Sequence, residues 1–177
     1  GLWEGMVINI PGLEDDDVTD ALSFLKQYRK DEDLKIEGKV LVIGGGSVAA
    51  DSANVALKSG AKEVNLVCLE DADEMPALEN EINELIERGV NIHNSWGPKE
   101  ISERKLKCVR CNCIFNEEGE FCPEFDKTKE KEIPFDKIIF AIGQGVEPSL
   151  KAYLENEFGS APIKVDPVTQ LIEGRKR

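Results

Sequence analysis

A run of three glycines at residues 44–46 lies between an apolar stretch and an alanine-rich one. The stretch before it, residues 40–43, is V-L-V-I, a short continuous apolar run typical of a buried parallel strand. The stretch after it, residues 47–59, is rich in Ala and is followed by Gly60, as expected at the carboxyl end of a helix. A strand, a glycine turn and a helix in this order predict the start of a β-α-β unit.

The alternation of strand-like and helix-like segments continues after the glycine turn. Residues 64–68 are expected to form a second strand, and residues 90–93 are a candidate for a third. Between them, Pro76 is expected to open a helix that Gly89 closes. Strand, helix, strand, helix, strand predicts a parallel sheet with right-handed crossovers.

The pattern changes after the third strand. Residues 106–115 alternate in the manner of a strand with one apolar face, and residues 116–131 form a polar stretch that is expected to be a loop. The chain then returns to an apolar strand at residues 138–142. The sequence therefore predicts an antiparallel excursion inserted into an α/β fold.

The glycine turn matches the pattern G-x-G-x-x-A of dinucleotide-binding turns, in the strand-to-helix context that this chemistry requires. The first glycine permits a tight turn, the third allows a diphosphate to approach the backbone, and the alanine lets the helix lie close to the sheet. Free amides at the start of the helix would face the phosphates. The alternative is a purely structural glycine-rich turn. The predicted phosphate site comprises Gly44, Gly45, Gly46, Ser47, Val48 and Ala49.

The end of the second strand is where preference between NAD and NADP is usually determined. Glu70 lies there, somewhat further from the glycine turn than the usual spacing of about 20 residues. Its carboxylate would accept hydrogen bonds from a ribose, and together with Asp71 and Asp73 it would repel a 2′-phosphate. We therefore expect NAD(H) to be favoured over NADP(H), unless these acids only form a solvated loop.

Four of the five cysteines lie close together in one short stretch of the sequence, at Cys108, Cys111, Cys113 and Cys122. Four thiolates could hold zinc or an iron–sulfur cluster, but on a regular strand Cys111 and Cys113 would face away from Cys108. A Cys108/Cys111 dithiol of the thioredoxin-reductase type would be expected at a helix N-terminus, not on a strand. The favoured interpretation is that these are reduced cysteines packed as small strand residues.

Composition narrows the possible partners. The 177-residue chain has 22 Lys and Arg against 35 Asp and Glu, a net charge of −13, which argues against nucleic acids and anionic membrane surfaces. No apolar run approaches the about 20 residues that span a bilayer. The odd cysteine count and the lack of a secretory leader favour a reducing, cytoplasmic setting.

Four motifs in this order resemble the pyridine-nucleotide domain of the glutamate synthase small subunit and its flavoprotein relatives, over residues 10–171. They are Ile10-Pro11-Gly12, residues 44–51, Glu74-Met75-Pro76-Ala77 and Ala141-Ile142-Gly143-Gln144. The resemblance implies a three-layer, Rossmann-like α/β domain with a parallel sheet and an antiparallel β-meander crossover.

The resemblance also implies a function. In that family this domain binds NADPH and passes hydride to FAD held by a second domain of the same chain, and an iron–sulfur or large-subunit partner accepts the electrons. We therefore expect residues 1–38 to be a connector and helix, residues 39–145 the NAD(P)-binding core, and residues 146–177 a segment leading to a missing FAD domain. Such a chain would be a fragment of an NAD(P)H-dependent FAD oxidoreductase, and we expect it to be inactive without the FAD domain. A nucleotide-binding or docking module without a redox step is the alternative.

Two departures from the family affect the predicted site. Ser47 stands where the family has Asn, and Leu69 and Glu70 stand where it has an Arg pair, which disfavours NADP. Asp51 matches a family position and would either support the nucleotide site or only complement the helix dipole. Gly143 and Gln144 would contact the nicotinamide half or form a plain turn.

Overall fold

The structure is a computed structural model that describes residues 2–14 and 17–146. It divides into two compact units, Gly5–Gln144 and a smaller one made of Gly1–Glu4 and Gly145–Arg177. The elements, in chain order, are β1 (Leu2–Gly5), β2 (Val18–Asp20), α1 (Ala21–Lys30), β3 (Lys39–Ile43), α2 (Ser47–Lys58), β4 (Glu63–Val67), α3 (Glu79–Glu87), β5 (Asn91–His93), β6 (Trp96–Ser102), β7 (Lys105–Phe115), β8 (Phe121–Pro134), β9 (Lys137–Phe140) and β10 (Gln144–Val146).

The larger unit is built on a five-stranded sheet with the order β2-β9-β3-β4-β5. All four of its strand pairs are parallel. The predicted strands 40–43, 64–68, 90–93 and 138–142 are thus β3, β4, β5 and β9. Because the chain leaves β3 toward β4 on one side and later returns to β9 on the other, a topological switch point lies at the carboxyl end of β3.

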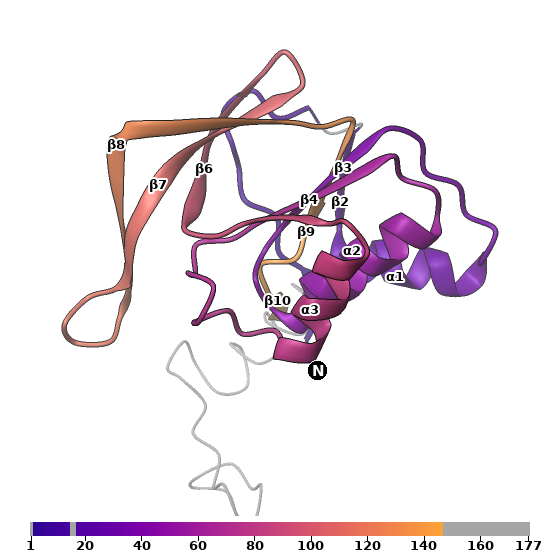
Figure 1. Ribbon diagram of the computed structural model, residues 1–177, viewed down its shortest axis with the longest axis horizontal. Coiled ribbons are helices and arrows are strands. Elements are labelled where there is room, and N and C mark those ends of the chain that lie inside the picture. Colours follow the sequence, from indigo (N-terminus) through magenta and orange to yellow (C-terminus); the bar gives the residue numbers. More distant parts are fainter. Residues whose placement is uncertain (1, 15–16, 147–177) are drawn as a thin grey trace, which may run out of the picture. The chain divides into compact units, whose positions relative to one another are not determined.

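Successive residues of β3 serve two separate cores. Val40 and Val42 pack with the helices, whereas Leu41 and Ile43 pack with the antiparallel sheet. This alternation is what a strand buried on both faces requires. Figure 1 shows α1, α2 and α3 on one side of the parallel sheet and the strands β6, β7 and β8 on the other. The predicted three-layer α/β fold is therefore confirmed.

Close packing of α2 on the sheet follows from its small side chains. Ala49, Ala50, Ala53 and Ala56 are almost completely buried, with Ser52 beside them. They recur at helical spacing, so one face of the helix carries no bulky group and its backbone lies close to β3 and β4.

The antiparallel excursion is a three-stranded sheet with the order β6-β7-β8. The polar stretch that the sequence analysis treats as a loop, residues 116–131, is largely strand, because β8 begins at Phe121. Only residues 116–120 connect β7 to β8. Polar side chains suit this strand because most of its residues are exposed or half-buried.

One helix boundary also differs from the sequence-based expectation. The third helix begins at Glu79 and not at Pro76, and the Glu81 carboxylate accepts a hydrogen bond from the Leu78 amide. The first helix is capped by Asp20, whose carboxylate accepts a hydrogen bond from the Ser23 amide.

The smaller unit is described only in part. Its described residues belong to β1 and β10, which pair as a two-stranded sheet. The segment 146–177, expected to lead to an FAD domain, lies outside the described residues apart from Val146. Within residues 2–14 and 17–146, no helix has the length and apolar character to cross a lipid bilayer.

Candidate functional site

A cavity of about 570 Å³ opens at the carboxyl end of the parallel sheet. Ile43, Val67 and Phe140, the last residues of β3, β4 and β9, line it, together with the turns that follow these strands. The cavity therefore lies at the switch point of the fold, where open α/β sheets bind their ligands. Its volume is in the range of small-molecule and cofactor sites.

The glycine turn forms one wall of the cavity. Gly44 has a φ of +140°, and a Cβ atom there would collide with the carbonyl oxygen of Ala141. Its amide donates a hydrogen bond of 2.9 Å to the carbonyl of Val67. The first glycine is thus required by the fold, since a side chain would push apart the ends of β3 and β9.

Gly46 is different, because a Cβ atom there would meet nothing within 4 Å. Its φ of −91° is accessible to any residue, so the fold itself does not require glycine at this position. Gly46 nevertheless lines the cavity at the start of α2. The missing side chain leaves room for a group that approaches the backbone from the cavity.

The amino end of α2 is open toward the same space. Gly46 is its N-cap residue, and no side chain caps the helix among the described residues. Ser47 and Val48 follow and line the cavity. Amides in the first turn of a helix lack intrahelical acceptors and carry the positive end of the helix dipole, so this corner suits an anion such as a diphosphate.

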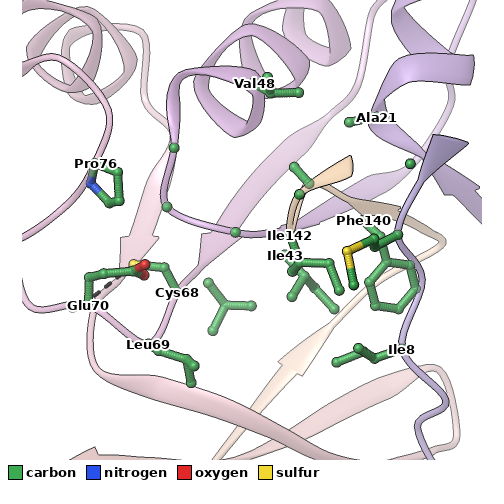
Figure 2. A pocket seen from close by; sticks show the side chains of 18 of the residues that line it. Ile8, Ala21, Ile43, Val48, Cys68, Leu69, Glu70, Pro76, Phe140 and Ile142 are labelled. Carbon is green, nitrogen blue, oxygen red and sulfur yellow. Dashed lines mark hydrogen bonds between the residues drawn. The ribbon is translucent and has the colours of Figure 1, made fainter. Parts of the chain in front are cut away.

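Glu70 lies against the glycine turn. A Cβ atom at Gly45 would come within 2.7 Å of Oε2 of Glu70, and both residues line the cavity. The backbone carbonyl of Glu70 accepts a hydrogen bond of 2.8 Å from the Ser95 amide, which fixes the loop after β4 to the segment after β5. Figure 2 shows Glu70 and Pro76 on one side of the turn and Ile142, Phe140 and Ile8 on the other.

The other end of the cavity is apolar. Met6, Ile8, Phe140 and Ile142 line it, together with Gly143 and Gln144. The Met6 amide donates a hydrogen bond of 3.1 Å to the carbonyl of Gly143, so the segment after β1 is held beside the turn after β9. This half offers apolar side chains, in contrast to the half at Glu70.

Eight of the ten predicted site residues line the cavity. Ala49 is instead completely buried on the side of α2 that packs against the sheet. Asp51 is exposed on α2 and lies outside the cavity lining. The eight are Gly44, Gly45, Gly46, Ser47, Val48, Glu70, Gly143 and Gln144.

Sequence reasoning missed other wall residues. Trp96 and Pro98 of β6 line the cavity. The position of Trp96 just after β5 gives a weak signal, because the carboxyl ends of parallel strands meet at one edge. Phe121 also lines the cavity but comes from a distant hairpin, and no local pattern indicates it.

The cysteines of the cluster differ in burial. Cys108 and Cys111 are both buried and Cys113 is exposed, so the predicted grouping of Cys111 with Cys113 is wrong. The β7–β8 pairing shifts register between Val109 and Arg110 and again near Cys113, which interrupts the alternation of the faces. In the part of the chain that the structure describes, no three His, Cys, Asp or Glu residues are placed to hold a metal ion.

Burial disfavours the thiolate form of the buried cysteines. Burial raises the pKa of the Cys68 and Cys108 thiols to about 12. Burial also raises the pKa of Cys111. A catalytic dithiol needs a lowered thiol pKa, so the geometry disfavours the Cys108/Cys111 redox pair.

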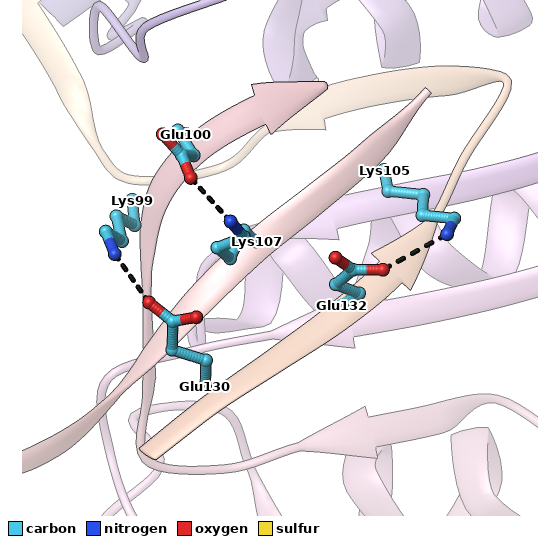
Figure 3. A network of polar contacts seen from close by, with 6 residues as sticks. All are labelled: Lys99, Glu100, Lys105, Lys107, Glu130 and Glu132. Atoms are coloured by element: carbon cyan, nitrogen blue, oxygen red, sulfur yellow. Dashed lines mark hydrogen bonds and ion pairs between the residues drawn. The ribbon is translucent and has the colours of Figure 1, made fainter. Parts of the chain in front are cut away.

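Six charged residues on the antiparallel sheet form three ion pairs. Figure 3 shows that Lys99 of β6 reaches across β7 to Glu130 of β8, with Glu100–Lys107 and Lys105–Glu132 as further ion pairs. Exposed pairs of this kind contribute little stability individually. Because opposite charges are interspersed, these residues do not form a patch of one sign.

The fold and the cavity define a Rossmann-type nucleotide domain, and comparison with known proteins identifies its family. The model of the pyridine nucleotide-disulphide oxidoreductase family matches residues 3–170, and the chain belongs to that family. The predicted family resemblance is therefore confirmed.

Relatives in this family are NAD(P)-dependent oxidoreductase subunits. The NADP(+)-dependent formate dehydrogenase subunit beta of Moorella thermoacetica is 34% identical over 159 residues, which are 84% of this chain and 22% of that subunit. The NAD-dependent dihydropyrimidine dehydrogenase subunit PreT of Escherichia coli K12 is 33% identical over 178 positions, covering 94% of this chain and 39% of that one. The glutamate synthase [NADPH] small chain of Halomonas elongata is 30% identical over 122 residues, 66% of this chain and 26% of that one.

Solved structures with the same fold include Mycobacterium tuberculosis FprA in complex with NADPH. That structure superposes with a TM-score of 0.71 at 17% identity, over 99% of this chain and 54% of that one. The chain thus spans between about a fifth and about two fifths of the curated relatives named above and about half of this structural neighbour.

Proposed function

We propose that this chain is the NAD(H)-binding domain of an FAD-dependent oxidoreductase. The observation that supports this best is the open glycine turn. Gly46 carries no side chain although the fold would accept one, and it faces a cavity at the uncapped start of α2. A dinucleotide is the ligand class that uses such a combination of a bare backbone and a helix N-terminus.

The cavity can be divided according to the parts of a dinucleotide. The backbone at Gly46, Ser47 and Val48 would hold the diphosphate. The Glu70 carboxylate would accept hydrogen bonds from the adenosine ribose. The apolar half near Ile142 would receive the nicotinamide ring, with Gly143 and Gln144 beside it.

The proposed preference for NAD(H) over NADP(H) depends on the charge of the wall. Glu70 would face a 2′-phosphate, and no Lys or Arg is found among the described residues that line the cavity. Burying like charges together costs binding free energy, and nothing on this wall compensates a phosphate. The names of the relatives include both nucleotides, so they do not decide the question.

This chain's part in the reaction would be to bind and orient. A bound dihydronicotinamide supplies a hydride, and the proposed acceptor is FAD held by another domain of the same protein. We also propose that residues 146–177 lead toward that domain, and that an iron–sulfur or large-subunit partner takes the electrons onward. The proposed setting is the cytoplasm, which the five free thiols support.

The direct test is a titration of the 177-residue chain with NADH and NADPH by calorimetry, with a Gly46→Ala variant as the comparison. We expect NADH to bind with micromolar-class affinity and more tightly than NADPH. In Gly46→Ala the new methyl group occupies the open space, so we expect the NADH affinity to fall at least about tenfold. The free energy of unfolding should change by less than about 1 kcal/mol. A chain that binds neither nucleotide, or a Gly46→Ala variant that binds NADH normally, would refute the proposal.

A further inference from the structure

One large aromatic side chain is left exposed at the edge of the cavity. Phe121, the first residue of β8, is 66% exposed and lines the cavity. Its ring meets that of Phe115 edge-on, with centroids 6.1 Å apart and planes at 75°. Phe115 is also exposed but does not line the cavity. The edge-on contact packs the Phe121 ring against that of Phe115.

The hairpin that carries Phe121 lies next to the adenosine side of the proposed site. The ring of Phe125, further along β8, lies so close to Gly97 that a side chain there would collide with it. Leu69, next to Glu70, is within 3.1 Å of the same position. The part of β8 at Phe125 is therefore packed next to Leu69, just after β4, and Phe121 of the same strand lines the cavity together with Glu70.

We infer that Phe121 is the stacking surface for the adenine ring. This inference rests on the proposed function and specifies one wall of its site. The adenine is bonded to the ribose that Glu70 would hold, so it must lie within one sugar's length of that carboxylate. A flat ring on an exposed phenyl group buries apolar surface on both partners and needs no hydrogen-bond donor.

Phe115 provides a matched control. Both phenylalanines are exposed, lie in the same hairpin and contact each other, but only Phe121 lines the cavity. Loss of either ring removes the edge-on contact. Only loss of Phe121 would remove the stacking surface, so the two variants separate hairpin stability from ligand contact.

The test uses calorimetry on the full 177-residue chain with three probes. NADH contains both halves, ADP-ribose lacks the nicotinamide, and reduced nicotinamide mononucleotide lacks the adenosine. In Phe121→Ala we expect the Kd for NADH and for ADP-ribose to rise by roughly tenfold, because an aromatic platform contributes on that scale to the binding of one base. The Kd for the mononucleotide should not change. Phe121→Trp should restore the affinity for NADH and ADP-ribose. Phe115→Ala should bind NADH with a Kd within about twofold of the wild-type value.

The outcomes separate this inference from the proposed function. If the wild-type chain binds NADH and Phe121→Ala binds it equally well, the stacking role is wrong and the proposed function stands. If Phe121→Ala weakens the mononucleotide as much as NADH, Phe121 does not face the adenine, and the inference also fails. A wild-type chain that binds none of the probes overturns both.

Discussion

At the scale of single residues, the glycine turn combines two kinds of constraint that the sequence motif does not distinguish. Gly44 is required by the fold, because its φ is +140° and Ala141 leaves no room for a side chain. Gly46 is surrounded by open space and would tolerate one. Of these two, only Gly46 is a glycine that the fold does not require, and the pair shows why a motif match needs the surrounding geometry before it is assigned a function.

Glu70 is the residue expected to set nucleotide preference. In Glu70→Gln the repulsion of a 2′-phosphate is removed and the bond to the ribose hydroxyls is weakened. We expect the ratio of the NADPH Kd to the NADH Kd to fall at least about tenfold, measured by titration of the two nucleotides.

Glu74→Gln is the matched control for that variant, because Glu74 lies in the same acidic segment but is exposed and outside the cavity lining. It should leave the ratio within about twofold of the wild type. An equal shift in both variants would mean that general acidity of the loop, and not Glu70, determines the preference.

At the scale of the elements, the β7–β8 hairpin determines which cysteines are accessible. The register shifts along β7 leave Cys111 buried and Cys113 exposed, and Cys122 is exposed on the opposite strand. The sequence suggests a cluster of similar cysteines, but the hairpin separates them into two classes. Their reactivity should follow this division.

We predict that two of the five thiols react quickly with Ellman's reagent in the native protein and three only after denaturation. Burial keeps Cys68, Cys108 and Cys111 from the reagent, and it also raises the pKa of each of these thiols, which lowers the thiolate fraction. Cys113→Ser and Cys122→Ser should each remove one fast-reacting thiol. A native count of no fast thiols, or bound zinc or iron in metal analysis, would restore the metal-site hypothesis.

At the scale of the whole larger unit, a chain of polar side chains connects the parallel and antiparallel sheets. The Nε2 atom of His93 lies 3.1 Å from Oδ1 of the buried Asn65, and its Nδ1 atom lies 3.3 Å from Nζ of Lys131. The same ammonium group lies 4.9 Å from the centre of the Trp96 ring, which lines the cavity. A neutral His93 that donates to Asn65 and accepts from Lys131 satisfies all these contacts.

This arrangement predicts a specific dependence of stability on pH. Desolvation by burial, and then the nearby Lys131, lower the pKa of His93 below its usual value of 6.5. As the pH falls below about 6.5, the unfolded chain takes up a proton that the folded chain resists, so the free energy of unfolding decreases. His93 contributes fully to stability above that pH and progressively less below it.

Urea unfolding at pH 7.5 and pH 5.5 would measure the effect. His93 is the only histidine in the chain, so a His93→Gln variant isolates its contribution from that of the carboxylates. The wild type should lose more unfolding free energy on acidification than the variant does. Equal losses in the two proteins would show that His93 is not held neutral.

The sequence by itself determined the central β-α-β unit with its glycine turn, because the apolar strand, the turn and the alanine face of α2 are all made by residues adjacent in the chain. It also placed Glu70 at the end of the next strand. Only the tertiary structure decided the rest of the cavity. Met6, Ile8 and Phe121 reach the cavity through non-local packing, and β8 is a strand because β7 pairs with it, although its own residues are polar. Local patterns record intrinsic preferences, whereas these walls depend on contacts between segments far apart in sequence, for which a single sequence gives no signal.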